Sequence, residues 1–308
     1  MIDMADLPVQ LPAAPASPAA ARARFFNSGN AFNIKLPPVP AADFAAVLAA
    51  AAAPDAPTGL FACDQSGAMG CAFPATTPLM LARYARIREG DALALALHAT
   101  GLIAYVLRGA GAIAGPEGFA WGAGDVVLLP GDRPVTLRAA TDALLWIVTN
   151  EPMLALDGAR PGPAAVAPVH YPAAEIERQL ALLATTTTNP DTSGLALIFS
   201  SDTLEAGRNI APTLTLSLNT LPPGEAQPPH RHNSAAITLA LRGEDCHSLV
   251  AGQRCPWTVG STLVTPPGEP HSHHNGGGVG ARFLIVQDGG LHYHARTMGF
   301  VFLGQQTG

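Results

Sequence analysis

Short apolar runs alternate with glycine, proline and aspartate along most of the chain. Between about residues 84 and 150 they read LALALHATGLIAYVLRGAGAIAG and GDVVLLPGDRPVTLRAATDALLWIVTN. After residue 195 the pattern resumes in PTLTLSLNTLPPGE, SAAITLALRGE, STLVTPPGE and ARFLIVQDGG. Short β-rich runs separated by turn residues are typical of a sandwich or a barrel. The pattern therefore predicts two β units.

Two helices are expected outside these units. The run FAAVLAAAAA, residues 44–53, can be capped by Asp43 and stopped by Pro54. In AAEIERQLALLA, residues 173–184, apolar side chains recur at helical spacing. We expect an N-terminal arm with a short helix at 1–80, a first barrel at 81–150, a linker with a helix at 151–194 and a second barrel at 195–308.

An internal repeat relates the two β units. One frame of spacings is shared by two sets of residues: Gly224, His230, His232, Ala236 and Gly243, and Gly90, Ala96, His98, Leu102 and Gly109. A second frame is formed by Gly260, Pro266, Gly268, His271 and Asn275. Its first four positions recur with the same spacings at Gly124, Pro130, Asp132 and Val135. A duplicated small barrel explains this common register.

The C-terminal copy reads G-x5-H-x-H-x3-A-x6-G and then G-x5-P-x-G-x2-H-x3-N. This resembles the two-part signature of the cupins, in which a glutamate stands where this chain has Ala236. The resemblance extends over residues 195–300 and, more loosely, over 80–150. It implies an all-β bicupin, with two double-stranded β-helix (jelly-roll) barrels and a few short helices in one chain.

Three histidines of the second unit are candidate metal ligands. His230 and His232 project to one face of a strand because alternate residues share a face, and His271 could join them from the next strand pair. Three neutral imidazoles leave open coordination positions, which suits Fe(II). Imidazole also binds Mn, Ni and Zn, so the sequence does not choose the metal. The alternative is that these histidines are ordinary polar residues at a strand start.

The strings HRHNSAAITLALRG and TPPGEPHSHHN resemble the motifs of one cupin branch, the gentisate and salicylate 1,2-dioxygenases. The resemblance implies that His230, His232 and His271 bind Fe(II) and that His273 acts in catalysis at the substrate. The alternative for His273 is a structural hydrogen bond at the barrel rim. The implied reaction uses both atoms of dioxygen to open an aromatic ring that bears adjacent hydroxyl and carboxyl groups.

The chain departs from that branch at several positions. An arginine that would meet the substrate carboxylate is replaced by Thr238, and Arg208 could serve instead or could be a solvated loop residue. The first barrel keeps only His98 at its ligand positions, so we expect no metal there. A further pair, His292 and His294, lies beyond the last expected strand and is interpreted as structural. The substrate-binding candidates are Thr238, Arg208, Ala236, Gln287 and Trp257.

The composition restricts the classes of partner and the cellular location that we expect. The net charge is −6 without a run of Lys or Arg, which argues against nucleic acid and anionic membranes. The longest apolar stretch is too short to span a bilayer. No signal-peptide pattern is visible, and the four cysteines form no C-x-x-C pair, so we expect a reducing, cytoplasmic location. The Ala- and Pro-rich first 40 residues could be an arm of a homodimer or a larger homo-oligomer.

The sequence thus predicts an Fe(II)-dependent dioxygenase that cleaves a small, gentisate- or salicylate-like aromatic acid, with dioxygen as co-substrate. Two alternatives stay open. One is a metal-dependent cupin with another reaction, such as diketone cleavage, isomerisation or a lyase step. The other is a bicupin that binds a small molecule without catalysis.

Overall fold

The computed structural model describes residues 2–31, 36–163, 165–186 and 195–304. The chain divides into two compact units, Met1–Pro37 and Pro38–Gly308. The first unit contains two short helices, η1 (Met4–Asp6) and α1 (Pro18–Ala21), and an antiparallel bridge between Gln10 and Phe25. All further elements belong to the second unit.

Two antiparallel sheets form the first barrel. The larger sheet has the order β11-β8-β5-β10-β3-β2 and consists of β2 (Gly59–Ala62), β3 (Leu81–Ile87), β5 (Gly101–Arg108), β8 (Val126–Pro130), β10 (Ala143–Thr149) and β11 (Val169–Tyr171). The smaller sheet has the order β4-β9-β6-β7 and consists of β4 (Ala92–Leu95), β6 (Ala110–Ile113), β7 (Ala120–Gly122) and β9 (Val135–Ala139). The sequence predicted residues 81–150 for this barrel, but the larger sheet also includes β2 before that range and β11 after it.

Two sheets also form the second barrel. The larger has the order β1-β18-β15-β20-β13-β12 and consists of β1 (Ala42–Asp43), β12 (Leu195–Phe199), β13 (Thr215–Leu221), β15 (Ala236–Arg242), β18 (Thr262–Thr265) and β20 (Ala281–Gln287). The smaller has the order β17-β16-β19-β14-β21 and consists of β14 (His230–His232), β16 (Cys246–Val250), β17 (Gln253–Pro256), β19 (His271–Asn275) and β21 (Phe300–Phe302).

The two larger sheets have equivalent strand orders. The run β8-β5-β10-β3 of the first barrel corresponds to β18-β15-β20-β13 of the second. Each run carries one short extra strand at either end, β11 and β2 in the first barrel and β1 and β12 in the second. The duplication read from the sequence is therefore present in the topology, and the all-β bicupin prediction is confirmed.

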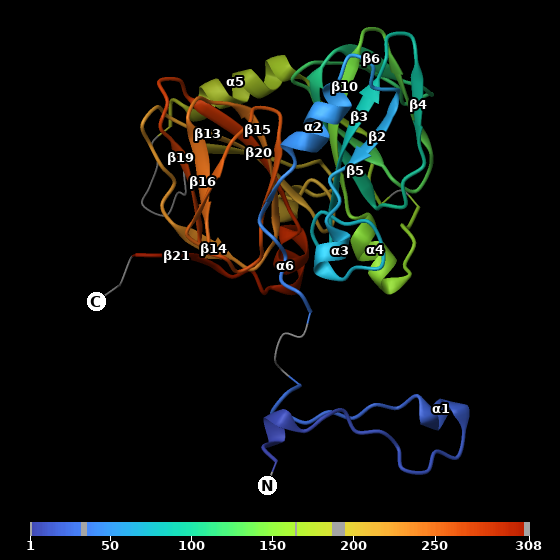
Figure 1. The fold of residues 1–308 in the computed structure, drawn as a ribbon. Helices are drawn as coiled ribbons and strands as arrows, with labels where there is room; N and C mark the ends of the chain where they lie inside the picture. Colours follow the sequence, from blue (N-terminus) through green and yellow to red (C-terminus); the bar gives the residue numbers. More distant parts are fainter. Residues whose placement is uncertain (1, 32–35, 164, 187–194, 305–308) are drawn as a thin grey trace. The chain divides into compact units, whose positions relative to one another are not determined.

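The barrels lie side by side in Figure 1, and their larger sheets share an apolar core. Alternate residues of β3, such as Ala82 and Tyr84, face this core, as do Ile237 and Leu239 of β15. Burial of such side chains is the main force that holds sheets together. Which side chains of a strand face this core follows from the period of two along its sequence.

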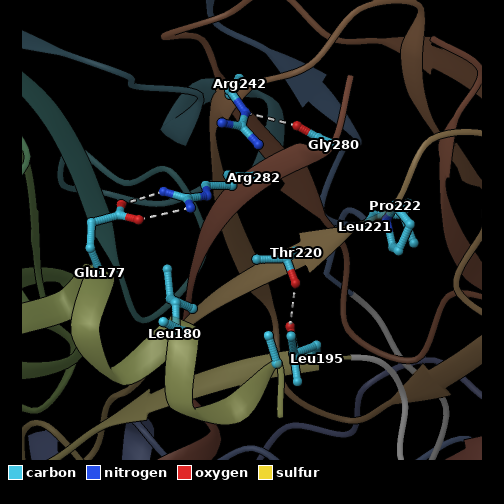
Figure 2. Close-up of a pocket in the computed structure, with 12 residues that line it drawn as sticks. Glu177, Leu180, Leu195, Thr220, Leu221, Pro222, Arg242, Gly280 and Arg282 are labelled. Carbon is cyan, nitrogen blue, oxygen red and sulfur yellow. Dashed lines mark hydrogen bonds and ion pairs between the residues drawn. The ribbon is translucent and has the colours of Figure 1, made fainter. Parts of the chain in front are cut away.

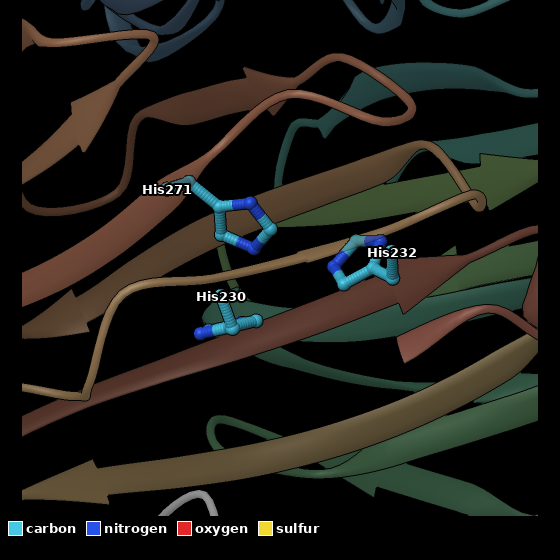
Figure 3. A group of neighbouring side chains, drawn as sticks. All are labelled: His230, His232 and His271. Carbon is cyan, nitrogen blue, oxygen red and sulfur yellow. The ribbon is translucent and has the colours of Figure 1, made fainter. Parts of the chain in front are cut away.

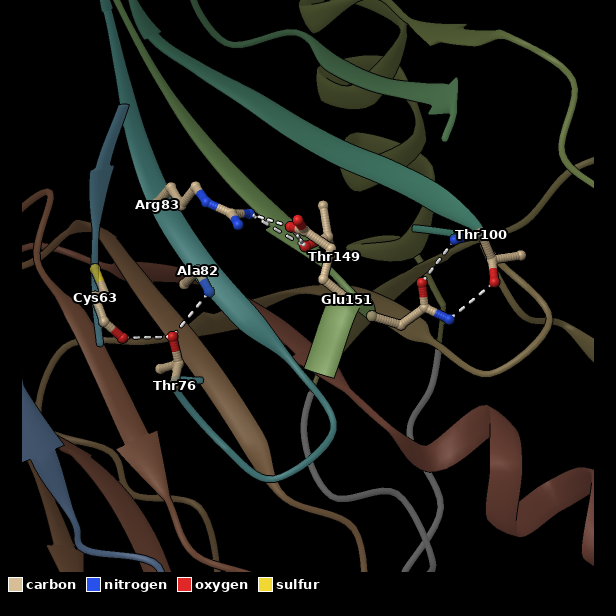
Figure 4. Close-up of polar contacts among 8 residues, drawn as sticks. Cys63, Thr76, Ala82, Arg83, Thr100, Thr149 and Glu151 are labelled. Carbon is tan, nitrogen blue, oxygen red and sulfur yellow. Dashed lines mark hydrogen bonds and ion pairs between the residues drawn. The ribbon is translucent and has the colours of Figure 1, made fainter. Parts of the chain in front are cut away.

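The interior of the first barrel is filled by a separate apolar cluster. It includes Ile87, Leu137, Leu145 and Trp121, all of which are buried. Polar contacts lie around this cluster: Arg83 pairs with Glu151 at 2.5 Å, and Asn150 Oδ1 accepts from the Thr100 amide at 2.8 Å (Figure 4). This barrel is therefore a packed scaffold.

Both helices expected from the sequence are confirmed. They are α2 (Ala45–Ala52) and α5 (Ala173–Leu183), and α5 buries Ile176 and Leu180. In the second unit the structure adds three short helical elements before β13: α3 (Ser66–Met69), α4 (Glu151–Asp157) and η2 (Glu205–Gly207). In the described part of the chain, no helix combines the length and apolarity needed to cross a bilayer.

One expectation was wrong. The second barrel does not end with β20, because α6 (Gly289–Ala295) and β21 follow it, and β21 pairs with β14. His292 and His294 therefore lie on helix α6, before the last strand of the barrel rather than beyond it. His292 keeps a structural contact there, since its Nδ1 lies 3.0 Å from Nδ2 of Asn233.

Candidate metal centre

Strands β14 and β19 bring three imidazole rings together inside the second barrel. His230 and His232 are buried while Arg231 between them is exposed, as strand alternation requires. His230 lies directly opposite His271 in the antiparallel register. One ring nitrogen from each of the three histidines lies within 4.8 Å of the others (Figure 3). The three candidate ligands therefore converge on one point.

The other ring nitrogen of each histidine is held by the backbone. Nδ1 of His230 lies 2.8 Å from the Pro228 carbonyl oxygen, and Nδ1 of His232 lies 2.8 Å from that of Ser234. Nδ1 of His271 lies 2.9 Å from the carbonyl oxygen of Glu269. A carbonyl only accepts, so each Nδ1 carries the proton and each Nε2 presents a lone pair. This donor set fits a divalent transition metal.

Burial keeps these rings neutral. It lowers the pKa of His232 to about 4 and that of His271 to about 3, with a smaller contribution from the neighbouring imidazoles. The pKa of His230 is also lowered by burial. Neutral imidazole is the form that binds metal ions, so the site needs no deprotonation at neutral pH before it can bind one.

A cavity of about 200 Å³ opens beside the three histidines. Its lining residues are Ala196, Ile198, Ser217, Asn219, Gln227, His230, His232, Ala236, Thr265, His271, His273, Ile285, Gln287, Tyr293, Met298 and Phe300. Among these described lining residues, none is lysine, arginine, aspartate or glutamate. The cavity is therefore polar but uncharged until a metal ion enters it.

The structure brings some of the predicted site residues to this cavity and leaves others away from it. Ala236, Gln287 and His273 line it, and the amide nitrogen of Gln287 lies 3.2 Å from Nε2 of His232. Thr238 is buried further along β15. Arg208 is exposed after η2, where its backbone has a positive φ, so it does not supply a cation to the cavity wall.

Trp257 also lies outside the cavity lining, but it contacts the wall from behind. Its indole ring packs against Phe283 with ring centroids 4.9 Å apart, and Phe283 lies 5.0 Å from the His273 ring. Its Nε1 donates to Ser248 Oγ at 2.9 Å. Trp257 is therefore connected to the cavity through other side chains.

Several lining residues were not singled out from the sequence. Asn219 on β13 and Gln227 before β14 supply carboxamides, and the side chain of Gln227 makes no hydrogen bond to another described residue. Phe300 on β21 stacks on His230 with ring centroids 5.0 Å apart. Inward alternation along β13 could have indicated Asn219. No local signal indicates Phe300, because it reaches the site through the pairing of β21 with β14.

The equivalent positions of the first barrel have different surroundings. Ala96 and Val135 replace two of the three histidines, and His98 is exposed. Nε2 of His98 lies 2.7 Å from the carbonyl oxygen of Ala159. In the described part of the chain, the three histidines of the second barrel are the one group of side chains found close enough to hold a metal ion.

A larger cavity of about 310 Å³ lies between α5 and the second barrel (Figure 2). Arg282 forms an ion pair with Glu177 at its wall, and Arg242 donates to the Gly280 carbonyl oxygen at 2.8 Å. Its lining includes no histidine or cysteine. This cavity is therefore separate from the candidate metal centre.

Comparison with known proteins agrees with this geometry. Residues 217–287 match the family model described as Cupin domain. The gentisate 1,2-dioxygenase of Ralstonia sp. is 35% identical over 79 residues, which cover 26% of this chain and 22% of the relative. The 1-hydroxy-2-naphthoate 1,2-dioxygenase of Nocardioides sp. strain KP7 is 29% identical over 159 residues, 51% of this chain and 40% of the relative. The matches thus span less than half of each relative.

Solved structures share the fold over most of the chain. Salicylate 1,2-dioxygenase from Pseudoaminobacter salicylatoxidans, crystallised with gentisate, has a TM-score of 0.71 at 14% identity, covering 89% of this chain and 88% of that one. Oxalate decarboxylase from Bacillus subtilis has a TM-score of 0.52 at 16% identity, covering 80% and 76%. The fold is that of a bicupin, with two jelly-roll barrels in one chain, and the second barrel contains the three-histidine group. Within that class, the protein resembles the gentisate and salicylate 1,2-dioxygenases.

Proposed function

We propose that the protein is a non-haem Fe(II)-dependent dioxygenase that cleaves the ring of a small hydroxylated aromatic acid of the gentisate or salicylate type. The observation that carries the proposal is the convergence of three imidazoles whose Nδ1 atoms are all held by backbone carbonyls beside a cavity. The likeness to named ring-cleaving dioxygenases supports the substrate class.

His230, His232 and His271 would hold the iron, and Mn, Ni or Zn could occupy the same nitrogen ligands. When bound, Fe(II) supplies the redox chemistry with dioxygen that amino-acid side chains cannot provide. Ala236 offers no fourth protein ligand, which leaves room for a substrate that chelates through two oxygens. Gln287 would orient the substrate from the wall beside His232.

The remaining residues of the cavity shape and shield it. His273 is 2% exposed and lines the cavity, so we assign it the hydrogen bond to a substrate oxygen. Phe300 and Ile285 supply apolar surface to the cavity wall, and the small Ala236 side chain leaves space for an aromatic ring. Arg208, Thr238 and Trp257 are not assigned a direct substrate contact, because they lie outside the lining.

The test is metal content followed by oxygen uptake. Protein loaded anaerobically with Fe(II) should bind about one metal per chain and consume dioxygen with gentisate, salicylate or a related hydroxy acid. His230→Ala should lose the metal and the activity. His247→Ala is the matched control, because His247 belongs to the same sheet but stacks on His274 outside the metal group. Metal binding without oxygen uptake across the panel would contradict the proposed reaction.

One observation favours a second candidate, a metal-dependent cupin with a different reaction. The described lining has no cationic side chain, so a carboxylate has no arginine partner in it. A neutral chelator such as a diketone needs none. Turnover of such a compound without oxygen would support an isomerase or lyase, and oxygen-dependent turnover would support diketone cleavage.

We also propose a cytoplasmic location and a homo-oligomeric state. All four cysteines are free, in keeping with a reducing compartment. The N-terminal unit exposes large apolar side chains, including Phe25 at 54% and Phe26 at 65%. Exposed apolar groups of this kind suit contact with a second copy of the chain. Size-exclusion chromatography with light scattering tests the oligomeric state.

A further inference from the structure

A chain of three hydrogen-bonded side chains leads from Trp257 to the cavity of the candidate metal centre. Trp257 Nε1 donates to Ser248 Oγ at 2.9 Å, and Ser248 Oγ lies 2.8 Å from Nδ1 of His273. Ser248 on β16 faces His273 on β19 in the antiparallel register. Both residues are nearly inaccessible to solvent, at 3% and 2% exposed. The hydrogen-bonding needs of these groups must therefore be met inside the protein.

The direction of each hydrogen bond follows from what the groups can donate. An indole nitrogen only donates, so Ser248 Oγ accepts from Trp257. The Ser248 hydroxyl retains one proton, and its only other hydrogen-bond partner among the described residues is His273. Buried donors are nearly always paired, so the Ser248 proton points to Nδ1 of His273. Nδ1 then accepts, and the proton of the neutral imidazole lies on Nε2.

This arrangement is opposite to that of the three candidate ligands. In His230, His232 and His271 a carbonyl oxygen faces Nδ1, so the proton is on Nδ1 and Nε2 is an acceptor. His273 lines the same cavity, and its Nε2 makes no hydrogen bond to another described residue. The cavity therefore contains three acceptor nitrogens for a metal and one N–H donor for a ligand.

We infer that Ser248 and Trp257 are positioning residues that fix His273 as the Nε2–H tautomer, so that it presents a hydrogen-bond donor to the cavity. The ligand that this donor fits is an oxygen chelator with a free lone pair beside the metal, such as a phenolate or carboxylate. The identity of that ligand rests on the proposed function, whereas the tautomer does not. Phe283, in contact with both Trp257 and His273, keeps water from this face.

Nitrogen NMR reads the tautomer directly. The full chain is labelled with ¹⁵N-histidine and loaded with Zn(II), which is diamagnetic and binds imidazole. Two-bond ¹H–¹⁵N spectra should show the proton on Nε2 of His273 and on Nδ1 of the three ligands. The His273 signals are assigned by their loss in His273→Gln. The zinc-free protein should show the same His273 tautomer, because the hydrogen-bond relay Trp257–Ser248–His273 needs no metal.

Variants of the relay test its direction. Ser248→Ala should move part of the His273 population to the Nδ1–H form, and Trp257→Phe should do so to a smaller extent. Ser248→Thr keeps the hydroxyl and should keep the Nε2–H form, which separates loss of the relay from loss of folding. Ser272→Ala is the matched control, since Ser272 lies on the same strand but its hydroxyl contacts His274. Nδ1–H in the unmodified protein, or an unchanged tautomer in Ser248→Ala, overturns the inference.

Salicylate serves as a probe of the donor. In the zinc protein it should shift the Nε2–H proton of His273, and Ser248→Ala should weaken its binding roughly tenfold with the zinc content unchanged. Binding without any shift at His273 would overturn the donor role. Absence of salicylate binding would instead contradict the proposed substrate class, and the tautomer spectra alone would then decide this inference.

Discussion

Asp288 is a buried carboxyl group that precedes α6, and among the described residues it forms no ion pair. It is 6% exposed, and its Oδ1 accepts from the Ala235 amide at 2.9 Å. Burial raises the pKa of Asp288 to about 7, and the backbone hydrogen bonds oppose this only in part. The ionised form is therefore less stable in the folded protein than in the unfolded chain, where the pKa is near 3.8.

The linkage between this pKa and folding predicts the effect of Asp288→Asn. As pH rises from about 4 to about 7 the unfolded chain loses the Asp288 proton first, so the wild-type free energy of unfolding falls. Asparagine keeps the oxygen acceptor and has no charge. Relative to wild type, the variant should become more stable over this window by roughly 4 kcal/mol in total, with no further gain above it.

Urea unfolding of both proteins at several pH values measures this difference. Contributions from histidines and other carboxyl groups are common to the two proteins and cancel. A difference that stays constant with pH would show that Asp288 ionises in the folded protein as it does in the unfolded chain.

At the scale of single elements, strand β14 was predictable and β21 was not. A period of two is enough to place His230 and His232 on one face, and the spacing to His271 is short enough to appear as a motif. Strand β21 has three residues, and its place is decided by hydrogen bonds to β14, which no local pattern encodes. Phe300 reaches the cavity through that pairing alone.

The relay to His273 was hidden from the sequence for the same reason. Ser248 lies on β16 and Trp257 directly follows β17, and only the register between β16 and β19 brings Ser248 opposite His273. The lack of Arg208 at the cavity is also a tertiary effect, because η2 leaves its side chain exposed. Motif spacing thus predicts candidate ligands, while their hydrogen-bond partners depend on strand pairing.

Strand β15 offers a test of the missing fourth ligand. Ala236 lines the cavity with the three histidines, so Ala236→Glu should add a carboxylate ligand. We expect zinc affinity to rise roughly tenfold or more, and salicylate binding to fall because a coordination position is filled. Competition with a chromogenic chelator measures the first effect, and calorimetry with salicylate measures the second.

Ala236→Gln is the control for this experiment, since glutamine has nearly the same volume and is a much weaker metal ligand. It should reduce salicylate binding through its size without raising zinc affinity. Equal zinc affinity in the Glu and Gln variants would mean that a side chain at position 236 does not reach the metal.

At the scale of the whole molecule, the two barrels are joined through a buried hydroxyl as well as through apolar packing. Thr262 on β18 is fully buried, and its Oγ1 lies 2.8 Å from the Tyr84 hydroxyl and accepts from Trp146 Nε1 at 2.9 Å. Tyr84 and Trp146 belong to β3 and β10 of the first barrel. The barrel without the histidine cluster therefore supports the sheet that lies behind the candidate site.

Two Thr→Val substitutions of equal size should have different effects on stability. Thr262→Val leaves the Trp146 N–H buried without its acceptor, which should lower the free energy of unfolding by roughly 1–3 kcal/mol. Thr238, on the neighbouring strand β15, is also buried, and its hydroxyl has no hydrogen-bond partner among the described residues. Thr238→Val removes that unpaired hydroxyl and should be neutral or slightly stabilising. Urea unfolding monitored by tryptophan fluorescence measures both free energies of unfolding. An equal loss of this free energy in the two variants would mean that the Thr262 hydroxyl makes no stabilising hydrogen bond, and the contact between the barrels would then depend on apolar packing alone.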